Sequence, residues 1–234
     1  SYLRMLSTLK QPKWIILTIV LIVAIYAFIN LSEWQFNRDE QRRTQNQEIK
    51  TALNKVPINI LDSTNLDNLI EWQPVQITGK VNTDNVRFAR NRYLDSSLGF
   101  WVIAPLNINE NQKVLINLGF LPVNYQNRFD EISIPNQTIS FKGWVRKMEN
   151  HKITPSDYPE LQISSISADN FAGDVYKNSY IQINDSSVDL KNIALLPEPK
   201  LSSGPHFSYA IQWIIFALLL PIGWIILYRG EKSN

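Results

Sequence analysis

The hydrophobic positions are concentrated in two long runs, one near each end of the chain. The first covers residues 14–31. The second covers residues 209–228, where Gln212 and Pro221 are the only exceptions to an apolar, aromatic or small composition. A helix rises about 1.5 Å per residue, so runs of this length can cross the ~30 Å hydrocarbon layer of a bilayer. The pattern therefore predicts two transmembrane helices, at residues 14–31 and 209–228.

Basic residues outside the two runs predict the orientation of the helices. Lys10 and Lys13 lie just before the first run, and Arg229 and Lys232 follow the second. Basic residues are enriched on the cytoplasmic side of membrane proteins, so both short tails are expected to be cytoplasmic, or in the matrix of a mitochondrion. The first run exceeds the roughly 7–15-residue core of a signal peptide, which favours a retained anchor.

Two crossings with both tails inside would place the long middle segment, residues 32–208, on the far side of the membrane. We therefore expect a two-pass protein of the inner (cell) membrane, with cytoplasmic tails at residues 1–13 and 229–234 and a periplasmic main domain. In a eukaryote the corresponding location is the mitochondrial inner membrane. Three arginines just past the first run, Arg38, Arg42 and Arg43, oppose this orientation.

The segment after the first run is polar and is predicted to continue the first helix out of the membrane. Residues 32–54 contain neither proline nor glycine, and Pro57 is expected to end the helix. Trp34, Arg38 and Arg42 recur at four-residue spacing and therefore share one helical face. This basic and aromatic face could hold lipid headgroups, a partner or an anionic ligand, or it could be a solvated collar at the interface.

The rest of the middle segment has the short apolar stretches of a β-rich domain. Strands are predicted at residues 72–81, 86–90, 99–106, 113–120, 138–146 and 179–184, and short helical patches at 66–71, 123–129 and 168–173. Most gaps between strands are too short for parallel crossovers. We therefore predict an α+β membrane protein in which two transmembrane helices flank one extracytoplasmic, antiparallel β-rich domain, curled or partly closed.

Composition excludes several classes of function. Residues 31–208 carry 18 Lys+Arg against 20 Asp+Glu, a net charge of −2, which argues against a general nucleic-acid-binding surface. The chain has no cysteine, so disulfides, thiolate metal sites and cysteine nucleophiles are ruled out. Neither a zinc-hydrolase motif, nor a phosphate-binding loop, nor a serine nucleophile elbow occurs, and we expect a protein that is not an enzyme.

Three polar features remain as candidate sites. His151 lies in a proline-bounded loop, where a surface role is the simpler reading. The stretch VRFARNRY, residues 86–93, could bind an anion or form a solvated strand face.

His206 lies just before the second apolar run. On a helix that begins there, it shares a face with Trp213 and with either Tyr209 or Ala210. It could be an ordinary interfacial histidine, or an iron ligand with aromatic neighbours suited to a flat porphyrin. Gln212 belongs to an adjacent polar strip, which is expected to face the helix pair or a partner protein.

Six stretches, taken in order, resemble motifs of the surfeit-locus family of cytochrome c oxidase assembly factors. LSEWQFNR at residues 31–38 is similar to the family's LGxWQxxR at the exit of the first span. PHFSYAIQW at residues 205–213 is similar to its NxHLxYAxxW at the entry to the second. Between them, WQPVQITGKV, GFWVIAPL, VLINLGFLP and FKGWVR resemble RPVxVxGxF, GxxVxTPL, VLVNRGWVP and GxVR.

The chain departs from the family pattern at four of these positions. Ser32 replaces a glycine, Ala104 a threonine, Leu118 an arginine, and Pro205 (or Gly204) an asparagine. The family's asparagine-tryptophan motif has no counterpart around residues 155–165. If the lost arginine or tryptophan contacts a ligand, this member is expected to bind that ligand more weakly or through other groups.

The resemblance implies a role in maturing the haem–copper oxidase, by delivering or guarding haem a for its catalytic subunit. It makes His206 the candidate iron ligand and Arg38 a candidate propionate partner, with further contacts from Trp34, Tyr209, Gln212 and Trp213. The expected partners are the oxidase catalytic subunit or its assembly intermediates, the enzymes of haem a synthesis and membrane lipid.

Two alternative hypotheses remain besides haem delivery. The chain could be a structural scaffold or accessory subunit bound to an oxidase subunit without handling haem. It could also be an unrelated membrane-anchored enzyme, although no catalytic constellation supports this. Direct copper delivery is not expected, because soft copper(I) prefers sulfur ligands and the chain offers only Met5 and Met148.

Overall fold

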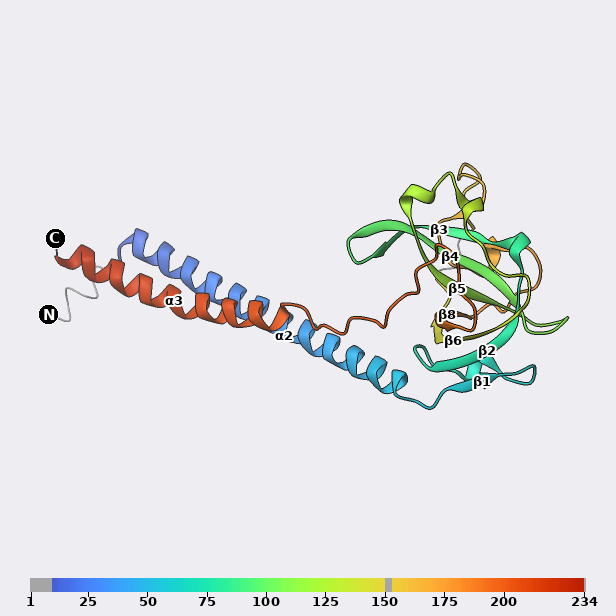
Figure 1. Cartoon of the computed structure of the whole chain (residues 1–234). Coiled ribbons are helices and arrows are strands. Elements are labelled where there is room, and N and C mark those ends of the chain that lie inside the picture. Colours follow the sequence, from blue (N-terminus) through green and yellow to red (C-terminus); the bar gives the residue numbers. More distant parts are fainter. Residues whose placement is uncertain (1–9, 150–152, 234) are drawn as a thin grey trace. The chain divides into compact units, whose positions relative to one another are not determined.

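The computed structural model describes residues 10–149 and 153–233 (Figure 1). The chain divides into two compact units. One comprises the residues up to 47 together with those from 200 onward, and the other comprises residues 48–199. The first unit is helical and the second is built on a β-sheet, so the α+β class with long helices flanking a β domain is confirmed.

Two long helices form the first unit. Helix α2 spans Pro12–Leu53 and helix α3 spans His206–Ser233. Both contain a stretch that is long and apolar enough to cross a membrane. The structure confirms that the first helix continues well past its apolar run, and Leu53 ends it four residues before Pro57. Pro221 lies inside α3 without ending it.

The helices pack antiparallel, as their contacts show (Figure 1). Trp14 near the start of α2 contacts Trp224 and Tyr228 near the end of α3, whereas Gln35 contacts His206 at the start of α3. Most of the less exposed positions recur at spacings of four and three, as in a left-handed helix pair. They are Trp14, Thr18, Leu21, Ile25, Phe28, Ser32, Gln35 and Asp39 on α2, and His206, Ala210, Trp213, Ala217, Leu220, Trp224 and Tyr228 on α3.

One eight-stranded sheet forms the second unit. Its strands are β1 (Ile58–Ile60), β2 (Pro74–Val81), β3 (Arg87–Leu94), β4 (Ser97–Asn107), β5 (Lys113–Pro122), β6 (Thr138–Lys147), β7 (Gln162–Ile163) and β8 (Ser179–Ser186). The six predicted strands are all present, with ends that differ by up to four residues. The short strands β1 and β7 were not predicted, because two or three residues are too few to show an alternating pattern.

The sheet closes on itself. The strand order is β1-β2-β6-β8-β5-β4-β3-β7, and β2 also pairs with β4 through Lys80↔Asn107 and Val81↔Leu106. This extra pairing completes a ring of five strands and leaves β1, β3 and β7 outside it. The predicted curled, partly closed sheet is therefore confirmed.

The prediction of a wholly antiparallel sheet is wrong. Three pairings are parallel: β1 with β2, β3 with β7, and β5 with β8. Each involves only two or three residue pairs, and no α-helix crosses between these strands in the described part of the chain. The chain passes from β3 to β7 through β4, β5 and β6, and from β5 to β8 through β6 and β7, so other strands replace the helical crossovers that a parallel pair usually needs.

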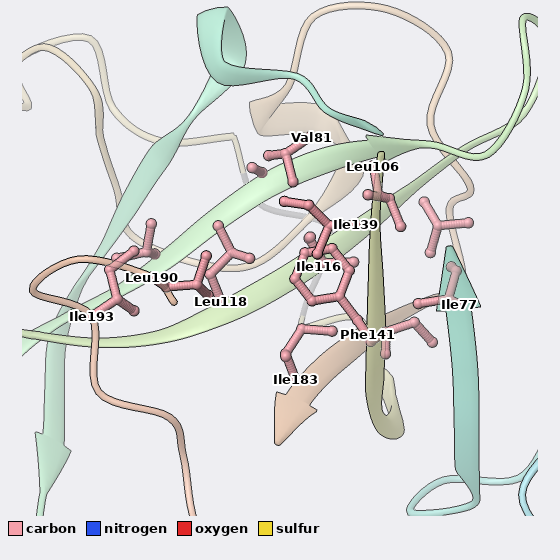
Figure 2. Close-up of a cluster of buried hydrophobic side chains, with 14 of the residues drawn as sticks. Ile77, Val81, Leu106, Ile116, Leu118, Ile139, Phe141, Ile183, Leu190 and Ile193 are labelled. Carbon is pink, nitrogen blue, oxygen red and sulfur yellow. The ribbon is translucent and has the colours of Figure 1, made fainter. Parts of the chain in front are cut away.

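The core fills the inside of the ring. Figure 2 shows side chains from β2, β4, β5, β6 and β8 that converge there: Ile77, Val81, Leu106, Ile116, Leu118, Ile139, Phe141 and Ile183, with Leu190 and Ile193 from the segment after β8. A second cluster, which includes Ile103, Leu115 and Tyr180, covers the other face of β4 and β5. Burial on both faces explains the continuous apolar runs of β4 and β5, whereas β2 alternates because one of its faces meets solvent.

The predicted helical patches are single turns of 3₁₀ helix. They are η1 (Leu66–Asn68), η3 (Val123–Tyr125), η4 (Phe129–Glu131) and η5 (Ala168–Asn170), and a further turn, η2 (Thr83–Asn85), was not predicted. Asn65, Asn82 and Ser167 cap η1, η2 and η5 through their side-chain oxygens. Such side chains favour turns over longer helices because they bond to nearby backbone N–H groups.

Candidate functional site

The polar candidates of the helical unit meet where α3 begins. Oγ of Ser32 donates a hydrogen bond to the carbonyl oxygen of Ala210 over 2.9 Å. One turn further along α2, Oε1 of Gln35 lies 2.8 Å from Nδ1 of His206. Ser32 is 4% exposed and Ala210 is fully buried, so the helix backbones approach closely at this level. The two bonds hold the start of α3 against the middle of α2.

With Oε1 of Gln35 facing the ring, the contact fits one tautomer of His206. An amide oxygen can only accept a hydrogen bond, so Nδ1 must carry the proton and donate it. In the neutral ring Nε2 then keeps its lone pair. Histidine ligands of metals are commonly oriented by such a bond at their second nitrogen, which also makes the ligating nitrogen more basic. The geometry therefore leaves His206 able to bind iron through Nε2.

Gly204 leaves space beside this nitrogen. Its φ of +74° lies in the left-handed region, which glycine adopts without strain. A Cβ atom built on Gly204 would lie 3.6 Å from Cδ2 and 3.7 Å from Nε2 of His206. The Nε2 edge of the ring thus lies next to a residue with no side chain, and a bulkier residue would fill the approach to it.

An aromatic cluster and a groove lie further along the helix pair. The ring of Trp213 lies 5.2 Å from that of Phe28 and 5.8 Å from that of Phe216. Beyond them an apolar groove of about 420 Å³ lies between the helices. It is lined by Leu17, Val20, Leu21, Ala24 and Phe28 of α2, and by Phe216, Leu219, Leu220, Gly223, Trp224 and Leu227 of α3. This volume is within the range of small-molecule pockets.

The groove and the His206 site lie on the same stripe of α2. Leu21, Ala24 and Phe28 line the groove, and spacings of three and four continue the stripe to Leu31 and Gln35. Phe28 and Gln35 are seven residues apart, or about 10 Å along the helix. The groove therefore ends at Phe28, about 10 Å along α2 from the residue that is hydrogen-bonded to His206.

Four of the other predicted site residues are exposed. Trp34 is 54% exposed and Tyr209 is 47% exposed, and both lie outside the buried seam between the helices. Gln212 is also exposed, so it does not face α2 as a polar strip inside the pair would. Arg38 is exposed and donates to Oε1 of Gln41 over 3.2 Å. Ala210, rather than Tyr209, occupies the face that His206 shares with Trp213.

Gln35 is the site residue that sequence reasoning missed. It follows Trp34 directly in the LSEWQFNR motif, and Trp34 was the residue of this pair that was predicted to belong to the site. Once Phe28 is known to lie in the seam, counting in steps of four and three reaches Ser32 and Gln35. The prediction required the partner helix, because only the pairing shows which face of α2 is buried.

Other candidates lie elsewhere. The VRFARNRY stretch belongs to the β domain, where Arg92 forms an ion pair with Glu149. Met148 packs against the second core cluster, which gives it a structural role. His151 and Met5 lie outside the described residues.

Comparison with known proteins identifies the family. The model of the SURF1 family matches residues 22–218, most of the chain. The chain belongs to the SURF1 family. This is the surfeit-locus family that the sequence motifs predicted.

The relatives that match are SURF1-like proteins. Uncharacterized SURF1-like proteins of Mycobacterium bovis and Mycobacterium tuberculosis are each 28% identical over 232 residues, which cover 93% of this chain and 84% of theirs. A SURF1-like protein of Dictyostelium discoideum is 27% identical over 108 residues, covering 42% of this chain and 40% of its own.

The structure explains two departures from the SURF1 motifs. Ser32, in the place of a glycine, lies at the close contact with Ala210, where only a small residue fits. Leu118, in the place of an arginine, is fully buried and packs in the ring core near Leu190 and Ile193 (Figure 2). In this chain position 118 therefore stabilises the domain and is not available to a ligand.

Proposed function

We propose that this chain is a membrane-anchored assembly factor of the haem–copper cytochrome c oxidase, and that it holds haem a as cargo for the catalytic subunit. Family membership supports the link to the oxidase. The haem proposal rests on one observation: Nδ1 of His206 is engaged by Gln35, which leaves Nε2 free to bind iron beside Gly204. Iron coordination through a single histidine suits a carrier that must later release its cargo.

The surroundings of His206 fit the two other parts of such a cargo. The groove between α2 and α3 suits an apolar ligand portion and is not enclosed, so cargo can leave sideways into lipid. Arg38 lies three residues from Gln35, and its one hydrogen bond within the described chain is to the neutral Gln41. Its charge can therefore pair with a propionate of the cargo.

The proposed membrane arrangement follows from the helix pair. The apolar parts of α2 and α3 cross together, with Trp14, Trp224 and Tyr228 clustered at the end where the tails lie. Lys13 forms an ion pair with Glu231 at the same end. Basic residues there favour the cytoplasmic side, which would place the β domain in the periplasm or intermembrane space.

The absorption spectrum of the purified chain tests the haem proposal. The chain is co-expressed with the enzymes of haem a synthesis and purified in detergent. We expect a Soret band in the wild type and its loss in His206→Ala. His151→Ala replaces the other histidine of the chain and serves as the matched control, with its Soret band retained. Circular dichroism shows whether each variant stays folded.

The same preparation separates haem carriage from scaffolding. The exposed Trp34 on α2 is the feature that favours a scaffold, because exposed aromatic rings commonly anchor protein contacts. A wild-type chain that carries no haem but co-purifies with an oxidase subunit would support the scaffold. An undiminished Soret band in His206→Ala would exclude this histidine as the ligand.

A further inference from the structure

A polar pocket is formed entirely by residues of the β domain. It has a volume of about 430 Å³ and is lined by Arg90, Asn91 and Arg92 of β3, by Glu149, and by Tyr158, Ser164 and Ser165. These residues come from β3, from the segment just after β6 and from the loop that carries β7. Two guanidinium groups and one carboxylate give the lining a formal charge of +1.

The single carboxylate of the pocket is paired with Arg92. Both oxygens of Glu149 accept from the guanidinium of Arg92 over 2.7 Å, and Oε2 also accepts from the backbone N–H of Ile166. The guanidinium of Arg92 stacks 4.8 Å over the ring of Trp101. Its Nε is buried and has no acceptor within the described residues. Glu149 therefore neutralises Arg92, and no ion pair joins it to Arg90 within the described residues.

Arg90 is held in place but not neutralised. Its guanidinium lies 5.0 Å over the ring of Tyr158, and it forms no ion pair with a carboxylate in the part of the chain that the structure describes. A stacked guanidinium keeps its five N–H donors at its edges, where they can bind an oxyanion in a forked geometry. Ser164 also lines the pocket, and its Oγ lies 3.4 Å from Oγ1 of Thr154.

A bulge in β3 creates this arrangement. The register with β4 shifts between Ala89 and Arg92, so that Arg90 and Asn91 together oppose one residue of the partner strand. Asn91 adopts a φ of +57°, an unusual conformation for a residue other than glycine. The shift places Arg92, rather than Asn91, on the face of Ala89 and Trp101. Bulges often redirect side chains at functional sites.

From these observations we propose that the pocket binds the phosphate group of a small molecule. The acceptor oxygens of the phosphate would take forked hydrogen bonds from the Arg90 guanidinium, which lines the pocket. Phosphate matches this geometry because it presents several acceptors to a guanidinium fork. The site lies in the β domain and does not depend on the haem proposal.

The test is a titration of the full chain in detergent with inorganic phosphate, against chloride at equal ionic strength. The amide signals of Asn91 and Ser164 in nuclear magnetic resonance spectra report binding. We expect saturable shifts in the wild type and at least a tenfold weaker affinity in Arg90→Gln. Arg128→Gln is the matched control, because Arg128 also stacks on a tyrosine ring, 4.7 Å over Tyr125, but lies outside the pocket. We expect its affinity for phosphate to equal that of the wild type.

Two further measurements make the result decisive. Arg90→Lys keeps the charge without the fork and should bind with intermediate affinity, which guards against a folding defect in Arg90→Gln. Glycerol 3-phosphate replaces phosphate in a parallel titration. Tighter binding of it supports a phosphoester, such as a lipid headgroup, as the ligand, and equal binding supports free phosphate. Equal affinity in Arg90→Gln and wild type, or an absence of saturable shifts, would overturn the site.

Discussion

His206 and Gln35 join the two helices through a 2.8 Å hydrogen bond between residues 171 positions apart. Replacing Gln35 with leucine removes the acceptor and frees the imidazole to rotate. If His206 binds haem iron, Gln35→Leu should lower haem affinity about tenfold, the lower end of the range for such orienting bonds. Haem titration of the purified variant measures the effect. Gln45→Leu, at an exposed position of the same helix, should bind like the wild type.

The contact between Ser32 and Ala210 predicts a disulfide across the helix pair. The Ser32 hydroxyl lies 2.9 Å from the Ala210 carbonyl oxygen. The chain has no cysteine of its own, so no other disulfide can form. We expect Ser32→Cys with Ala210→Cys to cross-link on mild oxidation. A protease site is inserted between Glu110 and Asn111. After cleavage, the two fragments stay joined on a non-reducing gel only if the disulfide has formed. Trp34→Cys with Ala210→Cys should give separate fragments, and equal linking of both pairs would contradict the observed pairing.

Gly223 allows the groove to be filled without disturbing the helix. It lines the groove, and a Cβ atom at this position would meet no atom within 4 Å. Gly223→Leu should therefore fold normally, with a small gain in helix stability, since glycine is about 1 kcal/mol less favourable than alanine in a helix.

If the groove holds part of the proposed cargo, the same change should reduce bound haem severalfold. The ratio of Soret to protein absorbance measures it. Gly230→Leu is the matched control, since Gly230 is on α3, outside the groove lining, and also has an open Cβ position. Undiminished haem in Gly223→Leu would show that the groove is not used.

Tyr180 predicts a loss of domain stability at alkaline pH. Burial raises the pKa of Tyr180 from 10.0 to about 12. Between these values the unfolded chain loses a proton that the folded chain keeps, so stability falls as the pH rises from 10 to 12. The loss amounts to roughly 2 to 3 kcal/mol, and below pH 10 this contribution is fully retained.

Denaturant unfolding across this pH range measures the effect. Tyr180→Phe keeps the packing of the ring but removes the titrating group, so its stability should decline less steeply than that of the wild type. The difference between the two slopes isolates Tyr180 from other groups that titrate in the same range. Parallel slopes would mean that Tyr180 ionises equally well in the folded and unfolded states.

The local pattern of apolar and polar residues was sufficient to predict much of the fold. The apolar runs predicted both long helices, and alternation or apolar runs of five to ten residues predicted six strands. The pattern failed at β1 and β7, which are too short to show periodicity, and at the three parallel pairings. Strand direction within a closed sheet depends on connections that local periodicity does not encode.

For the candidate site, the sequence by itself determined the residue types and the position of His206 along the second helix. Its place at the start of the second apolar run and the family motifs both follow from local order. Only the tertiary structure decided that Gln35 orients the imidazole, that Trp34 and Tyr209 face outward, and that Leu118 lies in the core. The physical reason is that burial and hydrogen bonding here are set by α2 against α3 and by the closure of β2 on β4, contacts between segments far apart in the chain.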